Sequence, residues 1–200
     1  RATMETIILL EAAGFDTVLV ETVGTGQSET MVSDMVDFFL VLMLPGAGDD
    51  LQGIKKGILE LADMIAVNKA DAFESKVNVA VRDYKAALRI LAGHSEAWQP
   101  PVLPVSGLKG DGLADLWANI EKHQRIMTAN GMREKRRERQ RLSWFDRLLG
   151  DRLLDHFKRM PAVASHMQDV RSNVLTGDML PNDAVLKLID IAFSSPARAE

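Results

Sequence analysis

Short apolar runs alternate with longer amphipathic stretches along the first two thirds of the chain. The short runs are rich in Val, Ile and Leu, as in strands covered on both faces. In the longer stretches, apolar residues recur every three or four positions, as in helices packed on a sheet. The alternation predicts an α/β fold with a parallel sheet and flanking helices. Strands are expected at 17–21, 37–44, 64–68 and 102–106, and helices at 4–13, 30–35, 49–62, 73–91 and 111–128.

After Asn130-Gly131 the short apolar runs stop, and apolar residues recur only at helical spacing. Apolar side chains recur at helical spacing from 142 to 193, and Pro161 and Pro181 suit the first turns of two helices. We therefore divide the chain into an α/β part, residues 1–129, and an all-helical extension, residues 130–200. Its apolar stripes favour a subunit interface, with packing back onto the α/β part as the alternative.

Composition narrows the possible partners. The longest apolar run, 38–44, falls short of the roughly 18 residues that a membrane span needs, so no membrane partner is expected. A net charge of −4 argues against nucleic acid as the main partner. The chain has no cysteine, which excludes disulfides and thiolate metal sites and fits a cytoplasmic protein, or one of the mitochondrial matrix if the organism is eukaryotic. Its four histidines show no short metal-ligand spacing.

One basic cluster interrupts this acidic chain. Residues 133–141 carry six positive and two negative charges. We interpret the cluster as the solvated face of a helix, because glutamates are interspersed and helical periodicity follows. A nucleic-acid arm is the alternative, and a steep salt dependence of binding would reveal it.

The tetrapeptide Asn68-Lys69-Ala70-Asp71 follows the apolar run 64–67. At the end of a buried strand, Asn-Lys-x-Asp is typical of a guanine-binding site. The Asp71 carboxylate can accept hydrogen bonds from both N1–H and the 2-amino group of guanine, and adenine lacks that pair of donors. Asn68 would join the base to neighbouring loops, and the Lys69 stem would cover the ring. A surface turn is the alternative interpretation, since these residue types are common in turns.

Two further loops follow predicted strands. Glu21 ends the run 17–20, where P-loop proteins hold the water shell of Mg²⁺, and Gly24 would let the backbone approach a γ-phosphate. The small-residue loop Ser106-Gly107-Leu108 follows the fourth strand and suits the back wall of a guanine pocket. All of these positions are expected at the carboxyl edge of the sheet, where open α/β folds bind ligands.

The phosphate-binding motif Gly-x-x-x-x-Gly-Lys-Ser/Thr does not occur in the 200 residues. The nearest string, 48–53, is followed by Ile54 where the motif requires its lysine, so Lys55 and Lys56 are out of register. The chain also opens on Arg1 rather than Met and runs straight into a helical pattern. We expect an N-terminally truncated chain whose phosphate loop lies upstream.

The strings 12–16, 20–24, 26–29, 44–46, 50–57, 68–71 and 105–106 together resemble those of one family. That family is the methylmalonyl-CoA mutase-associated GTPases, cobalamin-delivery chaperones that are also named lysine/arginine/ornithine transport-system kinases. The resemblance covers nearly the whole chain. Residues 21–29 and 46–55 are far more specific for this family than Asn-Lys-x-Asp.

The resemblance implies a role for each matching position. Glu21 and Gly24 would be catalytic, with Glu21 holding Mg²⁺ through water, and 22–29 would form a switch that senses the γ-phosphate. Residues 46–56 would be a mobile loop used toward the mutase. GTP or GDP would be bound by Asn68, Lys69, Asp71, Ser106, Gly107 and Leu108, where Gly107 stands in place of the family's usual alanine.

The implied protein is a P-loop GTPase, with 1–129 as the carboxyl-terminal part of its GTPase domain and 130–200 as its dimerisation arm. It would be a homodimer that gates cobalamin loading and protects or reactivates an adenosylcobalamin-dependent methylmalonyl-CoA-type mutase. One alternative is a nickel-inserting GTPase, which should show Cys/His clusters that this chain lacks. The other is a non-enzymatic dimerisation or partner-binding fragment.

The missing phosphate loop generates a first prediction. The 200-residue chain alone should neither bind GTP tightly nor hydrolyse it, because phosphate positioning supplies most of the catalysis in phosphoryl transfer. A single-turnover assay with the chain in excess over GTP measures this. Hydrolysis above the protein-free background would contradict the prediction.

Overall fold

The computed structural model describes residues 2–22, 28–45, 56–91 and 97–193. The chain forms two compact units, Arg1–Gln140 and Arg141–Glu200, and each is described by itself. The division expected at 129/130 between a GTPase domain and a dimerisation arm stays a prediction. None of the helices in the described ranges is both long and apolar enough to cross a membrane.

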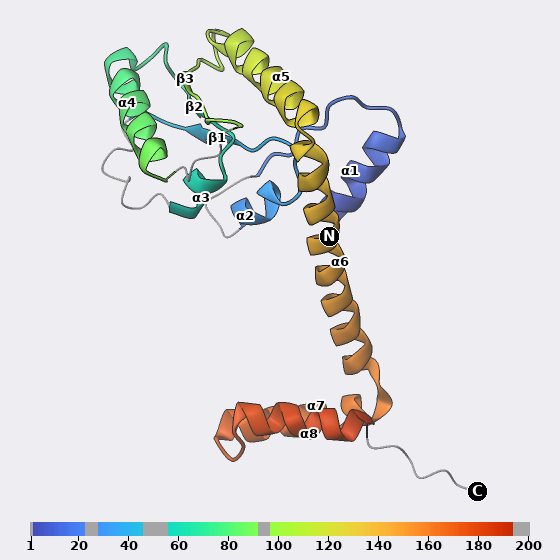
Figure 1. The fold of residues 1–200 in the computed structure, drawn as a ribbon. Coiled ribbons are helices and arrows are strands. Elements are labelled where there is room, and N and C mark those ends of the chain that lie inside the picture. The colour runs from blue at the N-terminus through green and yellow to red at the C-terminus, as the bar shows by residue number, and fades with distance from the viewer. Residues whose placement is uncertain (1, 23–27, 46–55, 92–96, 194–200) are drawn as a thin grey trace, which may run out of the picture. The chain divides into compact units, whose positions relative to one another are not determined.

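The first unit is built on a parallel sheet of three strands in the order β1-β2-β3 (Figure 1). Residues 64–67 of the central strand have no exposed surface. The predicted α/β class with a parallel sheet and flanking helices is confirmed. The elements are α1 (Ala2–Ala12), α2 (Ser28–Ser33), β1 (Leu40–Met43), α3 (Lys56–Leu61), β2 (Met64–Val67), α4 (Glu74–Leu91), β3 (Val102–Pro104), α5 (Leu113–Ala129) and α6 (Met132–Arg159).

Helix α4 covers the sheet with a narrow apolar stripe. Val77, Tyr84 and Leu88 are buried and lie seven and four residues apart, on one face of the helix. They join Ile65, Val67 and Val102 in a single hydrophobic core. This packing fixes α4 against β2 and β3, and so fixes where the loops after those strands emerge.

The strand predicted at 17–21 is wrong, because this stretch has no regular secondary structure. A strand requires hydrogen bonds from a neighbouring strand, and among the described residues β1 pairs only with β2. Val20 instead packs against the core through its side chain, while Leu19 is 86% exposed. The apolar pattern identified a stretch that contacts the core without forming part of the sheet.

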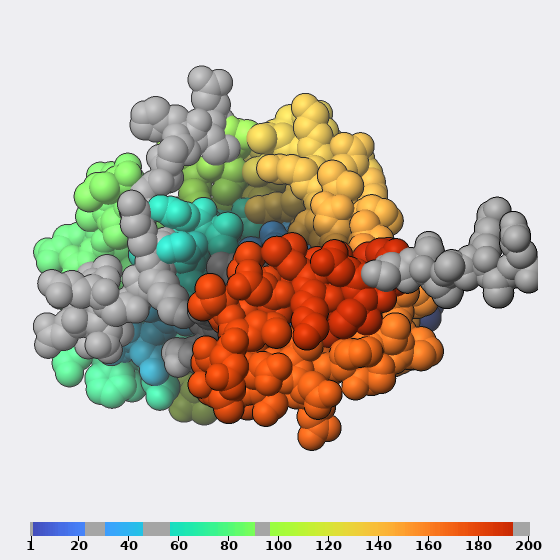
Figure 2. All heavy atoms as spheres, turned by 90° about the horizontal axis from the view of Figure 1, so that it is seen from below, coloured from blue at the N-terminus to red at the C-terminus, as the bar shows by residue number. Residues whose placement is uncertain are grey.

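The second unit contains a helical pair. Helices α7 (Pro161–Thr176) and α8 (Pro181–Phe193) lie side by side (Figure 2). They bury Val163 and Val170 against Ala184 and Leu188. Proline begins α7, as predicted, and Gly177 ends it with a left-handed φ of 82°.

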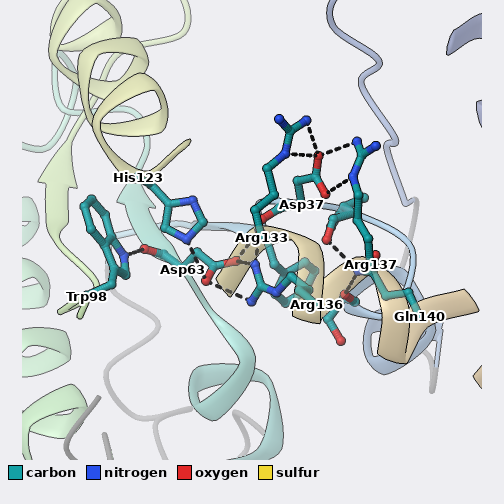
Figure 3. Close-up of polar contacts among 11 residues, drawn as sticks. Asp37, Asp63, Trp98, His123, Arg133, Arg136, Arg137 and Gln140 are labelled. Carbon is teal, nitrogen blue, oxygen red and sulfur yellow. Dashed lines mark hydrogen bonds and ion pairs between the residues drawn. The ribbon is translucent and has the colours of Figure 1, made fainter. Parts of the chain in front are cut away.

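The first turns of α6 belong to the first unit and are held there by ion pairs (Figure 3). Arg136 donates to Asp63 Oδ2 at 2.8 Å and to Oδ1 at 3.1 Å, and Asp63 directly precedes β2. The interpretation of 133–141 as a solvated face is therefore wrong for one side of the helix. The partly or fully buried side chains are Arg133, Arg136, Arg137 and Gln140, whereas Lys135, Glu138 and Arg139 are exposed.

Asp63 is buried and fully engaged. Besides Arg136 it accepts the backbone N–H of Phe39 at 2.8 Å, and His123 Nε2 lies 3.5 Å from its Oδ1. Burial on its own would raise the pKa of Asp63, but the hydrogen bonds and the Arg136 charge outweigh it and hold the pKa below its usual range. Asp63 is therefore a carboxylate at neutral pH and needs its cationic partner.

We predict that Arg136→Ala lowers the free energy of unfolding of the first unit by about 3 kcal/mol, because a buried carboxylate loses its main counter-charge. Hydrogen exchange of the β2 amides, which requires opening of the core, measures this change. Arg139→Ala is the matched control and should change the value by less than about 0.5 kcal/mol, since within the described ranges Arg139 bonds only a carbonyl of its own helix. Equal effects of the two substitutions would contradict the prediction.

Candidate functional site

The loops after β2 and β3 meet at the carboxyl edge of the sheet. The backbone N–H of Asn68 donates to the Met43 carbonyl at 2.8 Å, and that of Val105 donates to the Val67 carbonyl at 2.9 Å. The N–H of Ala70 then donates to the Val105 carbonyl at 3.0 Å. These bonds continue the pairing of the sheet into both loops, so the side chains on them are held close together.

Asn68 joins the two loops through its side chain. Its Oδ1 accepts the N–H of Gly107 at 2.9 Å and the N–H of Lys69 at 2.7 Å. With Oδ1 engaged in this way, the Nδ2 hydrogens are what Asn68 can offer to a bound ligand.

Asp71 is the carboxylate of the site, and Ser106 orients it. The buried Ser106 hydroxyl donates to Asp71 Oδ1 at 2.6 Å and accepts the N–H of Lys109 at 3.0 Å. The hydrogen bond from Ser106 lowers the pKa of Asp71. Asp71 is therefore ionised at neutral pH, with its second oxygen open to a donor from a ligand.

Lys69 has a left-handed backbone, with a φ of 64°. It is the only residue other than glycine with a positive φ in the described part of the chain. Side chains with a Cβ rarely adopt this conformation, and it carries strain of order 1–3 kcal/mol. Strain of this kind concentrates at ligand sites, which supports a role for the turn beyond linking β2 to α4.

The loop 106–112 contains two glycines with different constraints. A Cβ on Gly107 would lie 3.6 Å from Asn68 Oδ1, an ordinary contact, so an alanine would fit at this position. A Cβ on Gly112 would lie 2.5 Å from the Pro104 carbonyl oxygen, and Gly112 also has a φ of 76°. Sequence reasoning missed Gly112, although the close spacing Gly110-Asp111-Gly112 was a signal of a tight turn.

The helix predicted to begin at Asp111 begins two residues later, and Asp111 does not cap it. Helix α5 begins after Gly112, which occupies the N-cap position, and no side chain caps the helix. Asp111 instead accepts the Ser106 N–H at its backbone carbonyl, 2.9 Å away. The residue closes the loop that carries Ser106 rather than starting the helix.

A shallow hollow of about 260 Å³ opens beside Asp71. It lies between α4 and β3, and Leu108, on the neighbouring loop, is 87% exposed. The hollow is lined by both apolar and acidic side chains. The lining residues are Ala70, Asp71, Glu74, Val77, Asn78, Pro104 and Asp111.

The structure unites only part of the predicted site. It brings Asn68, Lys69, Asp71, Ser106 and Gly107 together at one edge. Glu21 lies within the described residues and is exposed, but it does not end a strand of this sheet. Gly24 lies outside the described residues. Within the described ranges, no group of three or more His, Cys, Asp or Glu side chains is arranged to hold a metal ion.

Comparison with known proteins points the same way as the motifs. A family model described as "Methylmalonyl Co-A mutase-associated GTPase MeaB" matches residues 1–162. A Caulobacter vibrioides protein named as a GTPase is 51% identical over 189 residues, which is 94% of this chain and 58% of that protein. A mouse protein named "Methylmalonic aciduria type A homolog, mitochondrial" is 38% identical over 98% of this chain and 47% of its own length.

A solved structure shares the fold. The crystal structure titled "LAO/AO transport system kinase" matches with a TM-score of 0.72 and 34% sequence identity. The match covers 94% of this chain and 60% of that one. The chain thus spans less than two thirds of the length of these relatives.

Proposed function

Because the chain belongs to the methylmalonyl-CoA mutase-associated GTPase (MeaB) family, we propose that it forms the guanine-binding part of a GTPase and its helical arm. The observation that carries this proposal is the oriented Asp71 carboxylate, held by Ser106 beside the loop that Asn68 fastens. GTP or GDP is the proposed ligand, and hydrolysis of the γ-phosphate is the proposed reaction.

The proposed base recognition follows from the donors and acceptors at the carboxyl edge. Asp71 accepts N1–H and the 2-amino group of guanine, Asn68 Nδ2 donates to the opposite edge of the base, and Lys69 and Leu108 cover the ring. Adenine offers no pair of donors to a carboxylate at that position. An ionised acceptor makes the stronger hydrogen bond, which is why the lowered pKa of Asp71 supports this reading.

The proposed phosphate chemistry rests on less of the chain. Glu21 is proposed to hold Mg²⁺ through water, and Gly24 to approach the γ-phosphate within the switch 22–29. The 200 residues contain no phosphate-binding loop, so the remaining phosphate contacts must come from elsewhere in such an enzyme.

The proposed biological role is that of a chaperone for an adenosylcobalamin-dependent mutase of the methylmalonyl-CoA type. The nucleotide state would gate cobalamin loading and the protection or reactivation of that mutase. Support for this partner comes from the name of the family model. The client enzyme is therefore proposed from family membership and not from a feature of the fold.

A homodimer is proposed because the second unit exposes apolar side chains at helical spacing. On α6 these are Leu142, Phe145, Leu149 and Leu153, and Leu153 is 60% exposed. Phe193 and Leu186 are exposed on α8. Exposed apolar side chains that gather on one helix face mark interaction surfaces in soluble proteins. The same observation favours a second candidate function, a partner-binding module without hydrolysis.

Asp71→Asn tests the base assignment in a chimera, with residues 1–200 replacing the matched region of the Caulobacter relative. We predict a loss of about 3 kcal/mol in GTP binding, roughly a hundredfold in affinity, and a gain for xanthosine triphosphate. The asparagine amide donates to the 2-oxo group of xanthine but opposes the 2-amino group of guanine. Titration calorimetry with both nucleotides measures the exchange.

Gly107→Ala is the matched control in the same loop, because its Cβ fits and both nucleotide affinities should stay unchanged. If the asparagine variant keeps its GTP affinity and gains none for the xanthine nucleotide, Asp71 is a turn residue and the guanine assignment is wrong.

Leu149→Glu combined with Leu153→Glu tests the arm in the 200-residue chain. We predict monomers by light scattering, because burying two carboxylates in an apolar contact costs several kcal/mol. The amides of β2 should keep their protection, since the first unit is not touched. A variant that remains dimeric would place the subunit contact elsewhere.

A further inference from the structure

Arg137 is bonded to two segments that are distant in the sequence. Its Nη2 donates to Glu11 Oε1, at the end of α1, at 2.9 Å. Its Nε donates to Asp37 Oδ1 at 2.8 Å, and Nη2 donates to Asp37 Oδ2 at 2.6 Å (Figure 3). One guanidinium therefore joins the last turn of α1 to the segment that leads from α2 into β1.

Gln140, on the next turn of α6, also binds the segment that leads from α2 into β1. Its buried side chain donates through Nε2 to the Val36 carbonyl at 2.8 Å and to the Ser33 carbonyl at 3.4 Å. Arg133, one turn before Arg137, adds hydrogen bonds to Asp37 Oδ2 at 3.2 and 3.0 Å. These side chains lie three to four residues apart and so share one face of the helix.

The two anchor points bracket the stretch that carries Glu21. Glu11 precedes that stretch at the end of α1, and Ser33 follows it at the end of α2. No residue of α1 is fully buried. The pair between Glu11 and Arg137 is therefore one of the contacts that fix where this stretch begins.

The bonds at Asp37 are of the stronger, charge-assisted kind. Burial on its own would raise the pKa of Asp37, but the Arg137 and Arg133 guanidiniums outweigh it and lower that pKa. Asp37 and Arg137 therefore remain charged together at neutral pH, and removal of the guanidinium leaves the Asp37 carboxylate with half of its partners.

We propose that Arg137 ties both ends of the Glu21-bearing stretch to one turn of α6. This inference goes beyond the proposed function, because the tie is formed by the chain alone and needs no nucleotide.

Hydrogen exchange of the 200-residue chain without nucleotide tests the proposal. Arg137→Ala should speed amide exchange about tenfold both in α1 and in residues 31–39, and leave α7 and α8 unchanged; tenfold corresponds to about 1.4 kcal/mol in local opening. Arg139→Ala is the matched control and should change neither segment, since among the residues that the structure describes Arg139 bonds only the Lys135 carbonyl.

Two one-sided variants separate the anchor points. Glu11→Gln should speed exchange in α1 alone, and Asp37→Asn, which removes the carboxylate that Arg137 binds, in residues 31–39 alone. An Arg137→Ala chain that changes one segment only, or neither, would overturn the proposal. If Arg137→Ala instead speeds exchange throughout β2, the fold itself has opened. The one-sided variants then decide, and the absence of either one-sided effect would refute the tie.

Discussion

The complete burial of β2 is the constraint on which the rest of the first unit depends. Its residues 64–67 have no exposed surface, and parallel neighbours hold the strand on both edges. Polar groups are therefore confined to its two ends. Asp63 lies at the amino end and binds Arg136, while Asn68 lies at the carboxyl end and binds the loop after β3. A short strand that cannot shift along its axis thus fixes the anchor of α6 and the candidate guanine site at the same time.

The two polar clusters differ in what they leave available. Around Asp37 and Asp63, arginines satisfy the carboxylates, so the charges serve to hold the first turns of α6 within the first unit. At the carboxyl edge, Ser106 uses one oxygen of Asp71, and Asn68 uses its Oδ1 to close the loop. The groups that remain, a carboxylate oxygen and an amide nitrogen, suit a base that presents donors on one edge and acceptors on the other. The arginines of the run 133–141 are therefore used to hold the fold together, and the carboxyl edge of the sheet is the better candidate for a ligand site.

Sequence reasoning succeeded where a local pattern decides the outcome. Strand β2, helix α4 and the prolines that begin α7 and α8 follow from periodicity and backbone preference alone. The stretch 17–21 was wrongly assigned because a strand depends on a partner that its own residues do not specify. The arginines of α6 were read as solvated because their partners, Asp37 and Asp63, lie about 70 to 100 residues earlier in the chain. The motif pointed to the proposed guanine site, and the glycine spacing at 110–112 indicated a tight turn, but the bond from Ser106 to Asp71 has no signature in spacing.

The central claim is that the carboxyl edge of this sheet recognises guanine. The most direct measurement is a titration of the 200-residue chain with millimolar guanosine and adenosine monophosphates, followed by the amide chemical shifts of both loops. The account predicts that the guanine nucleotide moves the signals of Asn68, Lys69 and Gly107, and that the adenine nucleotide does not. The signals of α7 and α8 should stay in place with either ligand. Equal shifts with both nucleotides, or shifts confined to other parts of the chain, would contradict it.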